Sequence, residues 1–282
     1  MTTGLASESS TGTAPGLRPE AAKGASFVGA TLAVCGRTVK KFMRTPALVV
    51  TGTLSGLMFL LIFRYVFGGA VSHTGAMSYV DFVVPGFVTT SLLFTGMGGA
   101  TGIAEDLQEG LVDRLRSLPI PQLAIVCGRV LADTILMTWG LLVMVVAGFA
   151  VGFRIHGGIG AGLEALGLCI VWGFAFCWLF VALGLVAGTP QGAQGLSFLV
   201  FPFSFISSAY VPVSTMPGWM QGFAQHQPLT VMVNSARILT QGHPAAAILG
   251  HGLGSYLPIS LLWTAAIIAV MAPMAVWRLR QG

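Results

Sequence analysis

The charged side chains that could do chemistry are concentrated in one polar run, 105–121, between two long apolar stretches. Acidic residues fill its first half and basic residues its second half, and four leucines recur there at helical spacing: Leu107, Leu111, Leu115 and Leu118. This pattern predicts a short amphipathic helix, which Pro119 and Pro121 end. Such a helix either lies on its own bundle or docks a cytosolic protein through its leucine face.

Motifs typical of enzymes are missing from the sequence. It contains no GxxxxGK[ST] loop to hold ATP phosphates, no GxSxG nucleophile elbow and no zinc motif among its histidines. The cysteines lack CxxC spacing and are interpreted as small buried hydrophobic residues: Cys35, Cys127, Cys169 and Cys177. We therefore expect no catalytic site, metal or cofactor on this chain, and any energy for transport to come from another polypeptide.

One carboxylate, Asp133, lies inside an apolar stretch, four residues after Arg129. An i,i+4 ion pair near the membrane interface is one interpretation. Carriers driven by protons or sodium keep a membrane-embedded carboxylate to bind the driving ion, so an ion-coupled carrier is an alternative hypothesis. A membrane scaffold without transport activity is a third.

The elements that position these residues must lie in a membrane, because the composition excludes an ordinary soluble enzyme. Of the 282 residues, 55% are hydrophobic and only 8% are charged, against about 25% in typical soluble chains. The net charge of +5 does not indicate nucleic acid, since the bases stand at the ends of apolar stretches.

Six apolar stretches are long enough to cross ~30 Å of hydrocarbon as helices. They are approximately 46–67, 83–104, 128–152, 163–187, 195–213 and 255–277. With these spans, eleven of the fourteen bases fall on one side and leave Arg64, Arg154 and Arg237 on the other. The positive-inside rule then places both termini in the cytoplasm, which predicts an all-α, multi-pass plasma-membrane protein.

The residues before the first span predict two elements. Residues 1–25 are rich in Ser, Thr, Gly and Pro and lack the features of a secretory signal, so they indicate a disordered cytoplasmic tail. The next segment, 26–44, predicts an interfacial helix whose bases lie near anionic lipid headgroups: Arg37, Lys40, Lys41 and Arg44. A juxtamembrane anchor without a moving part fits the same pattern.

Residues 195–254 predict two further features. Phe198, Phe201 and Phe205 on the fifth stretch are a candidate path for a hydrophobic substrate. Residues 214–254 are too long for a turn and predict two short helices, 216–225 and 228–240, that dip into the outer leaflet. Trp219, Pro228 and Arg237 mark this re-entrant segment.

The run EDLQEGLVDRLRSLPI at 105–120, together with GRVL at 128–131 and GFR at 152–154, resembles the membrane subunit of type 2 ABC exporters. The likeness is closest to the daunorubicin-resistance branch and extends over 26–280, with YVPVSTMPGW at 210–219 similar to its re-entrant region. The resemblance implies a homodimer or heterodimer that exports a hydrophobic antibiotic or lipid by alternating access. It also implies a separate ATPase subunit that carries the ATP and Mg²⁺.

The polar run would then be the loop that couples the ATPase to the membrane helices. On this resemblance and on the leucine pattern, we assign to the coupling loop Glu105, Asp106, Glu109, Gly110, Leu111, Arg114, Leu115, Ser117 and Pro119. Broader type 2 exporters often have a Gly-Thr-Leu-Glu run where this chain has Gly110-Leu-Val-Asp113. That departure favours the drug-resistance branch.

Overall fold

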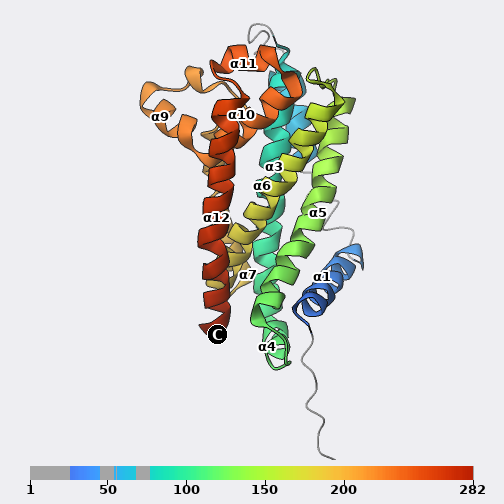
Figure 1. The fold of residues 1–282 in the computed structure, drawn as a ribbon. Coiled ribbons are helices and arrows are strands. Elements are labelled where there is room, and N and C mark those ends of the chain that lie inside the picture. The colour runs from blue at the N-terminus through green and yellow to red at the C-terminus, as the bar shows by residue number, and fades with distance from the viewer. Residues whose placement is uncertain (1–25, 45–53, 55, 68–76, 282) are drawn as a thin grey trace, which may run out of the picture.

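The structure is a computed structural model that describes residues 26–44, 54, 56–67 and 77–281. The predicted tail, 1–25, and residues 46–53 and 55 of the first predicted span, 46–67, lie outside the described residues. From that span the structure shows a short apolar helix, Gly56–Val66, and a π-helical turn, η1 (Phe63–Phe67). Figure 1 shows long helices that run side by side, with shorter helices gathered at both ends.

Four of the described helices are long and apolar enough to cross a membrane: α3 (Tyr79–Gln108), α5 (Gln122–Ala150), α6 (Gly158–Ala187) and α12 (Leu253–Gln281). They correspond to the predicted spans at 83–104, 128–152, 163–187 and 255–277. Each helix begins a few residues before its predicted start, because the prediction counted only the apolar stretch, whereas the helix also includes the residues just before it. The all-helical prediction and the multi-pass prediction are confirmed in this form.

The fifth predicted span, 195–213, is not one helix, and this part of the prediction is wrong. Two short helices, α7 (Pro190–Phe198) and α8 (Phe201–Phe205), are separated by a turn, and turns follow α8. Pro202 cannot donate a backbone N–H there. The hydroxyls of Ser204 and Ser207 bond to nearby carbonyls, at 2.8 Å to Phe201 and 2.6 Å to Ser204, which offers the backbone an alternative to a regular helix. The count of six spans is therefore not confirmed.

The predicted pair of short helices after 214 is present as α9 (Gly218–His226) and α10 (Pro228–Gln241), and α11 (His243–Leu249) follows. These helices lie together at one end of the bundle, after the 3-10 turn η2 (Val213–Thr215). That they form a re-entrant segment in the outer leaflet stays a prediction. The predicted N-terminal helix is present as α1 (Phe27–Arg44) and crosses α5 near the opposite end (Figure 1).

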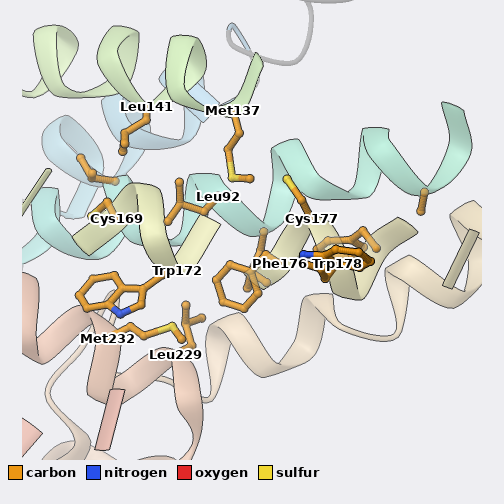
Figure 2. Packing of buried hydrophobic residues seen from close by; sticks show 14 of the residues in the cluster. Leu92, Met137, Leu141, Cys169, Trp172, Phe176, Cys177, Trp178, Leu229 and Met232 are labelled. Carbon is orange, nitrogen blue, oxygen red and sulfur yellow. The ribbon is translucent and has the colours of Figure 1, made fainter. Parts of the chain in front are cut away.

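The apolar core is centred on α6, which is hydrophobic on all sides and packs against α3, α5, α10 and α12. Figure 2 shows Trp172 and Phe176 of α6 between residues of the neighbouring helices, including Met137 and Met232. Gly184 lets α6 approach α3 closely, since a Cβ at this position would collide with the carbonyl of Ala100. This core holds the two ends of the bundle at fixed positions.

Candidate functional site

The predicted amphipathic helix over 105–118 is divided in the structure, so its continuity was predicted wrongly. Residues 105–108 form the last turn of α3, and a separate short helix, α4 (Leu111–Arg116), precedes the turn into α5. Gly110 separates the two with φ at +67°, a left-handed conformation that glycine adopts without steric cost. The polar run is therefore a tight helical corner between two long helices.

The four leucines of this run do not form one free surface. Leu107 and Leu115 pack against the core of the chain itself, and Val112 between them is only 1% exposed. Leu118 is 51% exposed and lies outside α4. The exposed surface of the corner, which we call the corner surface, consists of Glu105, Gln108, Glu109, Asp113, Arg114, Ser117, Leu118 and Pro119.

A buried arginine joins α3 to α5 directly behind the corner. From α5, Arg129 donates through Nη1 to Asp106 Oδ2 at 2.7 Å and through Nε to the Asp133 carboxylate at 3.0 and 3.1 Å. All three side chains are almost completely buried. The predicted i,i+4 pair between Arg129 and Asp133 is confirmed, but it lies inside the bundle, where Asp106 extends it across two helices.

Lys41 of α1 completes this cluster. Its Nζ lies 3.5 Å from Asp106 Oδ1 and 3.8 Å from Glu105 Oε2. Together, Lys41, Asp106, Arg129 and Asp133 form what we call the ion cluster, with two positive and two negative charges. Residues that the sequence assigned to separate features, an interfacial helix, a loop and a span, thus meet at one point.

The net formal charge of the ion cluster is zero. Buried charges need partners of opposite sign to offset the free energy of removing them from water. Gly99 and Gly102 of α3 leave the space for it, because a Cβ at Gly102 would collide with the Arg129 guanidinium. Asp133 is held as a structural partner of Arg129. The ion-coupled carrier hypothesis therefore loses the free carboxylate on which it depended.

Arg116 links the corner to α12. Its Nη1 lies 3.2 Å from Asp113 Oδ1, and its Nη2 donates to the backbone carbonyl of Leu279. The last carbonyls of a helix have no partner within the helix and carry partial negative charge, so they favour a guanidinium donor. No pattern in the sequence indicates this contact, since 163 residues separate the two partners.

The three predicted path residues stand in succession along one row of aromatic rings. Phe198 and Phe201 are stacked with centroids 5.2 Å apart, and Phe201 lies 5.0 Å from Phe205. The row continues from Phe205 to Tyr210 at 5.3 Å and from Tyr210 to Phe87 of α3 at 4.9 Å. Tyr210 belongs to the same aromatic stretch of the sequence, 195–213, whereas Phe87 joins the row only through tertiary packing, which the sequence did not indicate.

At the other end, Arg237 of α10 is fully buried, unlike the other two residues of the predicted outer trio. It donates to the backbone carbonyls of Phe82 at 2.9 Å and Ser208 at 2.8 Å, and to Asn234 Oδ1 at 2.9 Å. Its guanidinium carbon lies 3.7 Å from the centroid of the Phe82 ring. Trp219, by contrast, is 83% exposed, and Pro228 stands in the first turn of α10.

Among the described residues, no group of His, Cys, Asp and Glu side chains converges in a way that could hold a metal ion. The polar groups instead fall into two buried clusters at opposite ends of the bundle. The ion cluster, next to the exposed corner, is arranged to connect helices.

Comparison with known proteins finds transport proteins with similar sequences. Residues 29–240 match the sequence profile of the family described as ABC-2 type transporter. A daunorubicin resistance ABC transporter permease protein of Streptomyces coeruleorubidus is 32% identical over 253 residues, which cover 89% of this chain and 86% of that protein. A probable doxorubicin resistance ABC transporter permease of Mycobacterium tuberculosis is 28% identical, covering 89% and 88%. An inner membrane transport permease of Escherichia coli is 20% identical, covering 71% and 78%.

Proposed function

The chain belongs to the ABC-2 type transporter family and is a membrane permease of an ABC exporter, and we propose that a separate ATPase subunit drives it by docking on the corner surface. The observation that carries this proposal is the position of that surface. It is exposed, yet it is tied to α3, α5 and α12 through the ion cluster and Arg116. A push on the corner would therefore move several long helices together.

The chemistry of the corner surface supports a protein partner. Glu105, Glu109 and Asp113 offer carboxylates, and Arg114 offers a guanidinium. The exposed Leu118 and Pro119 add an apolar contact next to these charges. Charged groups at the rim and an apolar residue between them are typical of a protein interface.

The distribution of bases supports a cytoplasmic position for this end. The structure gathers α1, α4 and the C-terminus there (Figure 1), and with them the bases of α1 and Arg278 and Arg280 of α12. The other end holds α9, α10 and α11. Under the positive-inside rule, the α4 end of a plasma-membrane protein faces the cytoplasm, where ATP is available.

The aromatic row supports a hydrophobic or amphipathic cargo. Phe198 is 59% exposed and Phe205 is also exposed, so part of the row is accessible on the surface of a single chain. A second permease copy, identical or related, would enclose this surface and form a path between the two chains. The names of the relatives refer to resistance to daunorubicin and doxorubicin, so doxorubicin is a reasonable probe of the cargo class.

The experiment that tests docking changes exposed residues only. Glu109→Arg combined with Leu118→Asp is expected to leave membrane insertion unchanged and to abolish co-purification of the ATPase. Leu115 is unsuitable for this purpose, because it packs against the core and its change would disturb the fold. Gln225→Arg, which adds the same charge to exposed α9, serves as the matched control and should retain the ATPase.

Undiminished ATPase binding by the double variant would refute docking on the corner surface. A second measurement separates the ATP-driven exporter from an ion-coupled carrier. Doxorubicin transport into inside-out vesicles should continue when the proton gradient is collapsed and ATP is maintained. Transport that stops under those conditions would contradict the proposal.

A further inference from the structure

We propose that Lys41, Asp106 and Arg129 are positioning residues that pass movement of the corner surface to α1 and α5. This inference rests on the proposed function, since it concerns how ATPase docking reaches the membrane helices. It goes further by naming the contacts that carry the movement, and by naming α1 as the element that moves relative to α3.

Asp106 is the branch point of this connection. It lies in the last turn of α3, four residues before Gly110, where the helix breaks into the corner. One of its carboxylate oxygens accepts from Arg129 of α5, and the other faces Lys41 of α1. The contacts of this side chain therefore carry displacement of the corner to both α5 and α1.

The two contacts of Asp106 differ in strength. The contact with Arg129 is short, at 2.7 Å, and buried on both sides, so breaking it would leave charges without partners inside the bundle. The contact with Lys41 is longer, at 3.5 Å, and the lysine side chain is 42% exposed. Water can replace a partner of such a half-exposed charge at little cost. The Lys41 contact is therefore the one that can open and close.

Lys41 also has a second carboxylate within reach. Glu105 precedes Asp106 in α3, and its Oε2 lies 3.8 Å from Lys41 Nζ, with a side chain that is half exposed. A shift of α1 along α3 could transfer the lysine from the buried carboxylate to the exposed one without leaving its charge unpaired. Two alternative partners give this connection the two discrete arrangements that coupling requires.

The apolar contact of α1 with α5 is compatible with such a shift. Ala30, Val34, Cys35 and Thr38 face inward along α1, and they are all short side chains. At the crossing, Gly128 of α5 lies directly against the Thr31 carbonyl and Val34. Short side chains leave room for a small shift of α1, and the fit of Val34 against Gly128 limits how far the helix moves.

The test measures the doxorubicin transported per ATP hydrolysed by the permease and its ATPase reconstituted in vesicles. Lys41→Gln should leave yield, ATPase co-purification and ATP hydrolysis near wild-type values and lower this ratio about tenfold. Lys41→Arg, which keeps the charge, should restore it at least in part. Arg278→Gln removes an exposed base at the same end of the bundle and is the matched control.

A wild-type ratio in Lys41→Gln would overturn the inference, because a residue with a merely structural role would change stability and not this ratio. Glu105→Gln provides a second variant. It leaves no buried charge without a partner, because Lys41 still faces Asp106. Because Glu105 also belongs to the corner surface, ATPase co-purification is measured first; where it is retained, the ratio should fall about twofold to threefold through loss of the exposed partner of Lys41. Failure of the proposed function is distinguishable, because wild-type vesicles would then show no ATP-dependent transport, and both proposals would fall.

Discussion

Two buried arginines, at opposite ends of the bundle, are stabilised in opposite ways. Arg129 is held by the carboxylates of Asp106 and Asp133, and through Asp106 it is connected to the half-exposed Lys41. Among the described residues, the partners of Arg237 include no carboxylate; they are backbone carbonyls, the Asn234 amide oxygen and the Phe82 ring. The α4 end therefore uses ions, and the α10 end uses neutral dipoles.

The difference teaches which end can rearrange. Ionic partners of similar strength can be exchanged, as the two carboxylates near Lys41 illustrate. Arg237 is fixed by groups that belong to the backbone and cannot turn to another donor without moving the chain. We interpret the α4 end as the adaptable end, and the Arg237 clamp as a rigid attachment of α10 to the start of α3.

The largest effect is expected when the ion cluster loses its central cation. Arg129→Leu would leave Asp106 and Asp133 buried without a cation between them, and breaking a buried ionic contact in this way costs about 3–5 kcal/mol. Thermal unfolding in detergent and the yield of monodisperse protein should both fall sharply. Arg129→Lys, which keeps one charge, should lose less. A wild-type melting temperature for Arg129→Leu would contradict the ionic account of this end.

A smaller effect is expected at the α10 end. Arg237→Leu removes three hydrogen bonds and a cation–π contact but leaves only neutral acceptors behind, so we expect a loss of about 2–3 kcal/mol. The same unfolding measurement checks it. Asn234→Asp would supply Arg237 with a carboxylate and should preserve the melting temperature. If Arg237→Leu proves more damaging than Arg129→Leu, the comparison of the two ends is wrong.

The mobility of α1 can be examined through Cys35. Burial, and to a lesser degree the nearby Asp133 charge, raise the pKa of the Cys35 thiol, so less thiolate is present at any given pH than in a free cysteine. Maleimide labelling should therefore be slow at pH 7 and should accelerate as the pH rises toward 9. In Lys41→Gln, labelling should be about threefold faster, because α1 separates more readily.

This labelling requires serine at the other three cysteines, Cys127, Cys169 and Cys177. Mass spectrometry of the intact protein then reports one site. An identical labelling rate with and without Lys41→Gln would argue that α1 is held by its apolar contact with α5 alone, and would remove the distinction between an adaptable and a rigid end.

The smallest effect is expected in the stability of Lys41→Gln. Asp106 is buried but keeps its short contact with Arg129, and solvent screens the half-exposed lysine, so we expect a loss of about 0.5 kcal/mol. The melting temperature should change by no more than a degree or two, and high salt should produce the same small change in the wild-type protein. A loss as large as that of Arg129→Leu would show that Lys41 is an integral part of the buried cluster rather than its exchangeable member.

Much of the fold follows from the sequence, because long apolar runs leave few alternatives to membrane-spanning helices. The ion pair of Arg129 with Asp133 follows from their spacing on one helix. Gly110 carried a signal that the leucine spacing obscured, since glycine inside a helical pattern favours a break. The contact of Lys41 with Asp106 could not be predicted, because it depends on how α1 crosses α5.

The α10 end shows a second limit. Arg237 is a lone base in a predicted short helix, and nothing near it in the chain indicates that the carbonyls of Phe82 and Ser208 will accept its hydrogen bonds. Composition likewise suggested one kinked membrane-spanning helix over 195–213, whereas local bonding by serine hydroxyls and the missing donor of Pro202 divide it into short helices and turns. Local chemistry of this kind overrides apolar composition.

The contact of Arg116 with the Leu279 carbonyl brings the end of α12 beside α4. Any folded domain fused after residue 282 would therefore be attached next to the corner surface. We expect a C-terminal fluorescent protein on a short linker to act as a steric inhibitor of the exporter, and a long flexible linker to relieve that inhibition. Antibody fragments that recognise this terminus should block the exporter in the same way.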